Sequence, residues 1–175
     1  AFESCEALES VILGESVKQI GYNAFEYCSS LKEIALPDSV TSIGEGIFFC
    51  CTALEKVVIG DGVPNISYYA FNNCSALKNV IIGSSVISIE GYAFENCTSL
   101  TTIKIPDSVT TIGDEAFYDC ESLASVTIGE SVTKIGDSAF YNCPSLTSVI
   151  IGDSVTTIGD NAFWYCPSLT SVIIG

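Results

Sequence analysis

The sequence contains no histidine and no arginine, and tryptophan occurs only once. Without histidine, the chain lacks the usual general base near neutral pH and the commonest metal-ligating side chain. Its six basic residues are all lysines and stand against 21 acidic residues, which gives a net charge of −15. Because this charge repels phosphate backbones and anionic membrane surfaces, we expect no nucleic-acid partner.

Several sequence signatures are missing as well. No run of about 18 apolar residues occurs, so we predict no membrane insertion. The chain opens at Ala1 without an initiator methionine or a signal segment, which favours a mature fragment or a piece of a longer protein. Glycine-rich phosphate loops, nucleophile elbows and clustered metal ligands are absent, and the acids form no isolated pair for acid–base work. We therefore predict a non-enzymatic protein with no catalytic residues, no metal site and no cofactor.

What the sequence does contain is one unit of 23 residues, written over and over. A unit runs from Ala139 to Asn161 and starts again at Ala162. Seven full units and a partial eighth account for residues 1–175, which we predict to form a single solenoid domain. No unit buries its apolar residues alone, so equivalent side chains of successive units must stack into columns.

Each unit divides into three sides. The motif Ala-Phe-x-x-Cys-x-x-Leu, with Phe25 and Cys28 as examples, has the spacing of one helical face and predicts a short helix or helical turn. Alternating β-branched residues such as Val149 and Ile151 predict a short strand, and the motif around Ile158 predicts a second extended segment. The predicted fold is a repeat solenoid with a parallel β-sheet on one face and short helical turns and extended segments on the others.

Eight of the nine cysteines recur at the repeat interval and form a column. Stacked repeats are about 4.8 Å apart, so the Cβ atoms of column neighbours are too far apart for a disulfide. We predict that these cysteines are small buried hydrophobic residues. Cys50 alone lies outside the column. Its predicted state is either a free exposed thiol or an intermolecular bridge.

The unit resembles the BspA-like class of leucine-rich repeat, which reads Leu-x-x-Ile-x-Leu-Pro-x-x-Val-x-x-Ile-Gly-x-x-Ala-Phe-x-x-Cys, and residues 100–120 fit it almost position for position. The resemblance implies a right-handed leucine-rich-repeat coil of a kind found in bacterial and protist surface or secreted proteins and associated with adhesion. Local departures are Ile47 in place of alanine, Ser67 and Glu90 in place of glycine, and Ser84 in place of an acid. We expect these departures to alter turn geometry and to leave the fold unchanged.

Three groups of residues are candidate sites. Outward-facing strand residues would form a ligand-binding surface, although strand propensity alone also explains their β-branched members. Four aromatic residues near the C-terminus could stack on sugars or another chain, or simply cover the core. Asn65, Asn73 and Asn96 start N-glycosylation sequons. The predicted sheet residues are Lys56, Val58, Asn79, Ile81, Thr102, Lys104, Ser125 and Thr127, and the aromatic residues are Tyr118, Tyr141, Trp164 and Tyr165.

Two columns of acids follow the turns, and we interpret them as solvated turn residues and caps and not as calcium ligands, because the Gly-Gly-x-Gly-x-Asp calcium pattern is absent. The sequence therefore predicts a protein- or glycan-binding module of an extracellular or cell-surface protein. The alternative is a structural protomer of a filament, which would self-associate through uncapped solenoid ends or lateral contacts.

Overall fold

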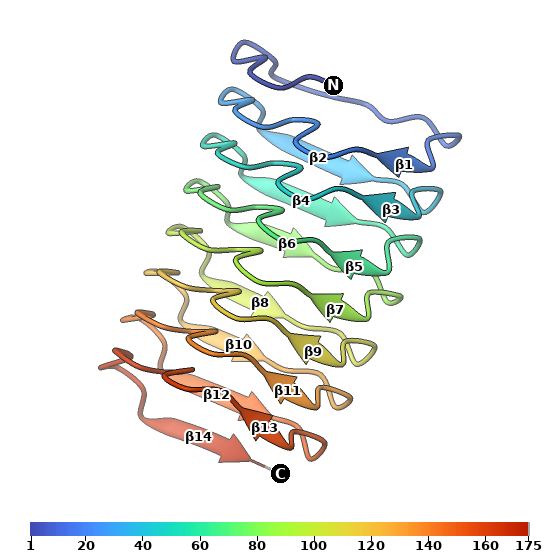
Figure 1. Ribbon diagram of the computed structural model, residues 1–175. Helices are drawn as coiled ribbons and strands as arrows, with labels where there is room; N and C mark the ends of the chain where they lie inside the picture. Colours follow the sequence, from blue (N-terminus) through green and yellow to red (C-terminus); the bar gives the residue numbers. More distant parts are fainter. Residues whose placement is uncertain (175) are drawn as a thin grey trace.

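The computed structural model describes residues 1–174 and shows a solenoid of parallel strands with about seven turns, here called coils (Figure 1). Gly175, which ends the partial eighth repeat, lies outside the described residues. Within those residues there is no helix, and thus no helix that could cross a membrane.

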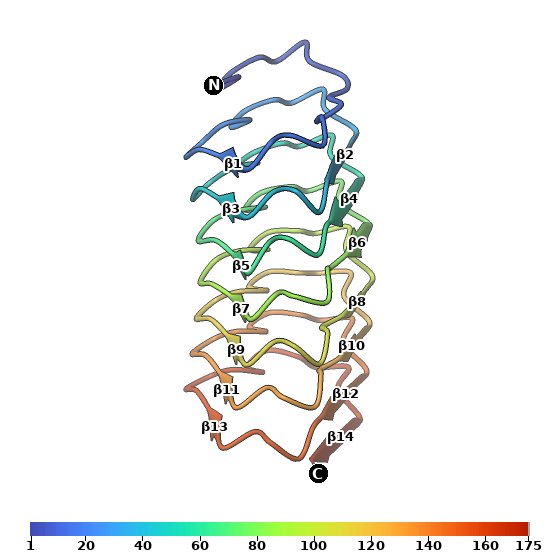
Figure 2. The ribbon, with the colours of Figure 1, turned by 90° about the vertical axis from the view of Figure 1, so that its right-hand side faces the viewer.

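The strands form two rows on opposite sides of the stack (Figure 2). We call the rows the wide sheet and the narrow sheet, and hydrogen bonding divides each of them into two ladders. The wide sheet contains β2 (Glu33–Leu36), β4 (Lys56–Ile59), β6 (Asn79–Ile81), β8 (Thr102–Lys104), β10 (Ser125–Thr127), β12 (Ser148–Ile151) and β14 (Ser171–Ile174). The narrow sheet contains β1 (Gln19–Ile20), β3 (Ser42–Ile43), β5 (Asn65–Ile66), β7 (Ser88–Ile89), β9 (Thr111–Ile112), β11 (Lys134–Ile135) and β13 (Thr157–Ile158).

Strand pairing keeps equivalent residues of successive repeats side by side. In the wide sheet, Val57 of β4 lies beside Ile34 of β2 and Val80 of β6. Side chains alternate along each strand, so Val57 and Ile59 are buried while Lys56 is exposed. The predicted side-chain columns are therefore confirmed.

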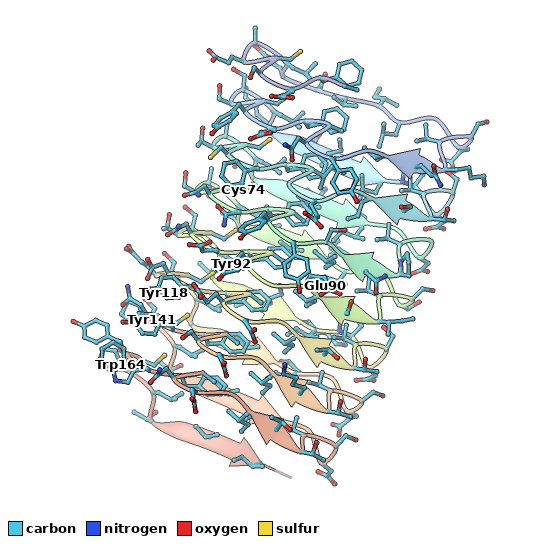
Figure 3. The ribbon with its side chains drawn as sticks, in the orientation of Figure 1. Cys74, Glu90, Tyr92, Tyr118, Tyr141 and Trp164 are labelled. Atoms are coloured by element: carbon cyan, nitrogen blue, oxygen red, sulfur yellow. The ribbon has the colours of Figure 1, made fainter. Side chains whose placement is uncertain are left out.

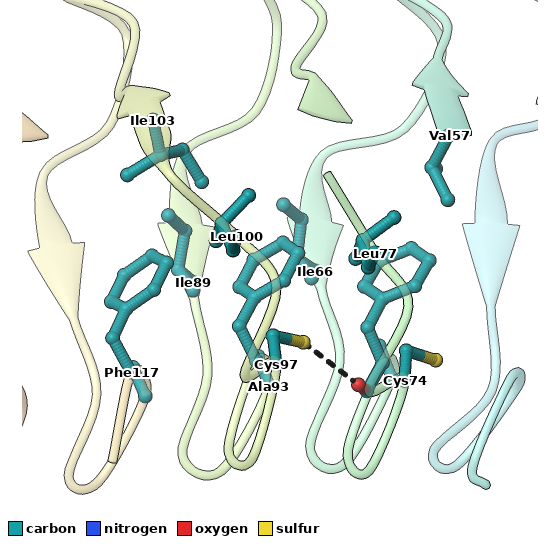
Figure 4. Close-up of a cluster of buried hydrophobic side chains, with 14 of the residues drawn as sticks. Val57, Ile66, Cys74, Leu77, Ile89, Ala93, Cys97, Leu100, Ile103 and Phe117 are labelled. Atoms are coloured by element: carbon teal, nitrogen blue, oxygen red, sulfur yellow. Dashed lines mark hydrogen bonds between the residues drawn. The ribbon is translucent and has the colours of Figure 1, made fainter. Parts of the chain in front are cut away.

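The widest of these columns is made of phenylalanine rings. Phe25 and Phe48 stack with ring centroids 5.4 Å apart, and Phe117 and Phe140 do so at 5.0 Å and nearly parallel. All four rings are at least 99% buried. Figure 4 shows this column beside the leucine, isoleucine and cysteine columns, which together form one continuous core.

The predicted burial of the column cysteines is confirmed for six of the eight, whereas Cys5 in the first coil is exposed and Cys166 in the last is half-buried. All nine cysteines are free thiols, and those at positions 28, 51, 74, 97, 120 and 143 are buried. Every column thiol after Cys5 also bonds the coil before it, as the Cys97 Sγ does by donating to the backbone oxygen of Phe71 at 3.3 Å (Figure 4). Cysteine thus fills a small apolar space and uses its weak donor there.

The helical prediction for the Ala-Phe-x-x-Cys segment was wrong. This segment is a pair of turns whose N–H groups bond the next coil, as Phe71 N does to Ala93 O at 2.8 Å and Asn73 N to Glu95 O at 2.9 Å. Asn73 has φ of 58°, and residues at the same position of the other repeats are left-handed too. A left-handed residue ends a right-handed helix, and a single helical turn is costly to nucleate, so the bonds between coils prevail.

Two adjacent residues, Phe48 and Phe49, test whether the stacked phenylalanine column stabilises the fold. We expect Phe48→Ala to lower the free energy of unfolding by about 3–5 kcal/mol, because it empties the centre of the ring stack. Phe49→Ala, next to it in the chain but only half-buried against Tyr27, should cost about 1 kcal/mol. Urea unfolding followed by circular dichroism measures both, and equal losses would contradict a core built on the Phe column.

Candidate functional site

The outer surface of the wide sheet carries the predicted binding residues. The structure places all eight outward: Val58 and Ser125 are half-buried and the other six are exposed. Parallel pairing puts Lys56 beside Asn79 and Val58 beside Ile81. It brings the remaining four together in a second group, with Thr102 beside Ser125 and Lys104 beside Thr127.

A break in the sheet separates these two groups. The hydrogen-bonded ladder β2-β4-β6 ends at β6, and a second ladder, β8-β10-β12-β14, begins at β8. We call this break the wide-sheet seam. At the seam Val80 and Ile82 are only half-buried, whereas the equivalent Val57 and Ile59 are at least 99% buried, so the core is partly open here.

Proline explains the position of the seam. At Gly60, Gly83 and Gly129 the preceding coil lies so close that a Cβ atom on these residues would be 2.6, 2.5 and 2.3 Å from a backbone oxygen. Pro106 occupies the same position of its repeat, and its ring keeps the coil of β8 from approaching β6 as closely. Pro37 is equivalent, and there too only one isolated bridge joins its strand to the coil before it.

The seam leaves backbone donors without partners. Within residues 1–174, the N–H groups of Ile82 and Thr101 form no hydrogen bond, whereas the equivalent Ile105 N donates to Thr127 O at 2.9 Å. Likewise, Ala124 N, the equivalent of Thr101 N in the next repeat, does have a partner, since it donates to Thr101 O at 2.8 Å. The donors at the seam are thus available to water or to a ligand.

A hollow of about 520 Å³ lies over the wide-sheet seam. Val80, Ile81 and Ile82 form one wall, and Lys104 and Pro106 belong to the other. Ser84, Asp107 and Ser108 complete its lining, so one apolar wall faces several polar groups, a combination that can orient a ligand.

Two further hollows lie on the same face. One of about 440 Å³ includes Lys56 and Val58, and one of about 550 Å³ includes Lys56 and Asn79. Within the described part of the chain, the ion pair between Lys78 and Glu55 at 3.2 Å is the only one, so Lys56 and Lys104 keep free ammonium groups. Three predicted residues line none of the described hollows: Thr102, Ser125 and Thr127.

The four predicted aromatic residues do come together, and Figure 3 shows Tyr118, Tyr141 and Trp164 on the turn side of the stack. The Tyr118 and Tyr141 rings stack at 4.6 Å, Tyr141 and Trp164 are 4.9 Å apart, and Trp164 and Tyr165 are 5.9 Å apart. With Asp119 they line a hollow of about 390 Å³. Sugar stacking at this aromatic patch stays a prediction.

The three sequons differ in accessibility. Asn65 is exposed on β5, whereas Asn73 and Asn96 are half-buried on the turn side. The amide nitrogen of Asn73 donates to Asn72 and that of Asn96 to Glu95. A glycan is attached through this nitrogen, so Asn65 is the best placed of the three, and its glycosylation stays a prediction.

Backbone donors of the next coil satisfy half of the acids in the two columns, namely Asp38, Asp61, Asp107, Asp114 and Asp137. The Asp137 carboxylate accepts from Asp160 N at 2.8 Å, and the Asp38 carboxylate accepts from Asp61 N at 2.8 Å. Each such acid thus caps the next coil and not a helix, which corrects the helix-cap interpretation. Across residues 1–174, no cluster of acids and cysteines has the arrangement of a metal site.

Burial sets the chemistry of the thiols. It raises the pKa of Cys51 to about 12 and that of Cys74 well above its usual value. Cys50 is only half-buried, and its pKa is raised by burial and then by the charge of Glu26. Cys50 is therefore free and accessible but weakly activated.

The comparison with known families matches this geometry. The family model for the BspA type leucine rich repeat region matches residues 1–120 and 88–175, with six copies. The chain belongs to the BspA-type leucine-rich-repeat family. Its fold is similar to that of a leucine rich cell surface protein from Faecalibacterium prausnitzii A2-165, with 39% identity and a TM-score of 0.80 over 89% of this chain and 42% of that one.

Two other solved leucine-rich-repeat proteins are similar to this BspA-type chain. The T. pallidum protein is 30% identical with a TM-score of 0.72, over 82% of this chain and 63% of that one. The Bacteroides ovatus ATCC 8483 protein is 30% identical with a TM-score of 0.62, over 97% of this chain and 61% of that one. The chain spans less than two thirds of each of these three structures. No curated protein matches the sequence.

Amide exchange tests the wide-sheet seam. We expect the N–H groups of Ile82 and Thr101 to exchange with deuterium faster than those of Ile105 and Ala124, which are equivalent but hydrogen-bonded. Two-dimensional NMR of the native protein resolves the four amides. Equal protection at all four would mean that β6 and β8 pair in solution.

Alkylation tests the thiol assignment. With iodoacetamide at pH 8, native protein should be labelled at Cys50 and not at Cys74, since the Cys74 thiol is buried and its pKa is raised further. Peptide mass mapping gives the label at each site, Cys50→Ser is the control, and unfolding in guanidinium should expose all nine thiols. Labelling of Cys74 at the rate of Cys50 would contradict the buried column.

Proposed function

We propose that this chain is a non-enzymatic binding module that holds another protein on the outer face of its wide sheet, in a protein of the cell surface or extracellular space. The observation that carries the proposal is the hollow over the wide-sheet seam, because it combines an apolar wall with the unpaired N–H group of Ile82 and the free Lys104 ammonium. An apolar centre with a polar rim is the usual anatomy of protein interfaces.

The rest of the wide face supports the same use. Its inward residues repeat almost unchanged, while its outward residues differ from coil to coil and have no packing role. Ile12, Ile81 and Ile150 are exposed by 97%, 57% and 49%, which is a large apolar surface for a soluble sheet to leave uncovered.

The surface location rests on a relative. The F. prausnitzii protein, 39% identical to this chain, is described as a cell surface protein. The match covers 42% of that protein. What the whole protein corresponding to this chain does is therefore also a proposal. Self-association through the solenoid ends stays a separate prediction.

Two matched triple variants test the proposal. The wide-sheet variant carries Lys56→Ala, Asn79→Ala and Lys104→Ala, and the narrow-sheet control carries Lys18→Ala, Gln19→Ala and Lys134→Ala. All six residues are exposed, and each variant loses two lysines and one side-chain amide, so the change in charge is the same. A protein captured by the immobilised chain from cell-surface extracts, then purified, should bind the wide-sheet variant about tenfold more weakly.

Surface plasmon resonance gives the two dissociation constants. The control variant should bind as the unchanged chain does, and both variants should keep its melting temperature, since none of the six side chains is buried. A tenfold loss with the control alone would move the site to the narrow sheet, and equal losses would indicate only a general charge effect.

A further inference from the structure

The narrow sheet has a seam of its own, between β3 and β5. In other coils a threonine or isoleucine N–H at this point bonds the coil before, as Thr41 N does to Lys18 O at 2.8 Å and Ile87 N to Pro64 O at 2.7 Å. Pro64 has no N–H to donate. The Ile43 oxygen is bonded by the Ser67 hydroxyl at 2.8 Å instead of by a backbone N–H, so a side chain bridges the two coils.

A groove of about 310 Å³ opens at this narrow-sheet seam. We call it the tyrosine groove, and its polar and aromatic lining consists of Tyr22, Glu45, Asn65, Tyr68 and Glu90. Tyr22 is 72% exposed and Tyr68 is 45% exposed, so both rings are accessible from solvent. Glu90 directly follows β7 (Figure 3).

Three residues of the groove occupy one column. Tyr22, Glu45 and Tyr68 are equivalent residues of successive repeats, so the two tyrosines start about 10 Å apart with the glutamate between them. The next member of the column is Gly91, and a Cβ atom there would lie 2.9 Å from the Tyr68 ring. Because Gly91 has no side chain, the Tyr68 ring can lean over it, away from Glu45, and leave the groove open.

The groove is negatively charged and has unused acceptors. No lysine lines it, and in the described part of the chain the Glu45 carboxylate has no hydrogen-bond or ion-pair partner. Glu90 Oε1 accepts from the Ser88 hydroxyl at 2.6 Å, which leaves its other oxygen free. Exposed tyrosine rings and two carboxylates together attract a cation, and the net charge of −15 favours the approach of one.

We propose that the tyrosine groove binds the guanidinium group of an arginine in an exposed basic segment of a partner protein. A guanidinium is flat, so it can stack on one exposed tyrosine ring at about 3.5–4 Å, and its N–H fork matches a carboxylate. The compact lysine ammonium uses neither feature fully. This chain contains no arginine, so the guanidinium must come from another molecule.

Short peptides test the inference directly. The probe is acetyl-Gly-Gly-Arg-Gly-Gly-amide, and its control has citrulline in place of arginine, which keeps the shape and removes the charge. Chemical shifts of the groove amides, followed during titration at low ionic strength, should give a dissociation constant on the order of 1 mM for the arginine peptide. The citrulline peptide should bind about tenfold more weakly.

Variants locate the binding. Tyr68→Leu and Glu45→Gln should each weaken binding of the arginine peptide about fivefold, while Tyr68→Phe, which keeps the ring, should retain it. Glu121→Gln removes the same charge from an exposed turn elsewhere and should have no effect. Three outcomes would overturn the inference: equal binding of the two peptides, equal losses in Glu45→Gln and Glu121→Gln, or no shift of the groove amides with either peptide. The inference would also be overturned if maltose, a neutral disaccharide, shifted the groove amides while the arginine peptide did not.

Discussion

The stacking of one coil on the next is the interaction on which the whole structure depends. A coil of 23 residues has no core of its own, so its phenylalanine, leucine and cysteine side chains are buried only when the next coil supplies the other half of the contact. Phe rings 5.0–5.4 Å apart and backbone bonds between coils keep this spacing. A residue that does not fit this close to the neighbouring coil therefore changes the space between the two coils. The conformation of its own coil stays the same.

Both seams follow from this constraint, and both stay local. The wide sheet opens before Pro106, yet the narrow sheet continues from β5 to β13 across the same coils, and Phe71 and Phe94 still stack at 5.1 Å. The narrow sheet opens before β5, where Pro64 lies, yet β2, β4 and β6 pair without interruption. One side of the solenoid can therefore open without loss of the core, because the other sides hold the coils together.

The repeat period was enough to predict the columns and the cysteines buried in them, because both depend on residues 23 positions apart, and the alternation of β-branched residues predicted the strands. The helix prediction failed because an i, i+3 apolar spacing is shared by turns, and only the backbone shows that residues such as Tyr27 and Cys50 are left-handed. The eight sheet residues were placed correctly on the outer face. The tyrosine groove was missed because Ser67 and Glu90 were treated as local departures, and the column that contains Tyr22 and Tyr68 was not followed.

Prolines at two positions of the unit therefore shape the outer surface of the solenoid without altering its core. A proline after the first strand of a unit separates the wide sheet and exposes apolar side chains beside Lys104, whereas a proline before the second strand separates the narrow sheet and exposes carboxylates beside two tyrosines. The two openings lie on opposite sides and differ in charge, so they suit different chemical groups. Since neither opening disturbs the Phe column, a solenoid of this kind can acquire distinct recognition surfaces while its fold remains the same.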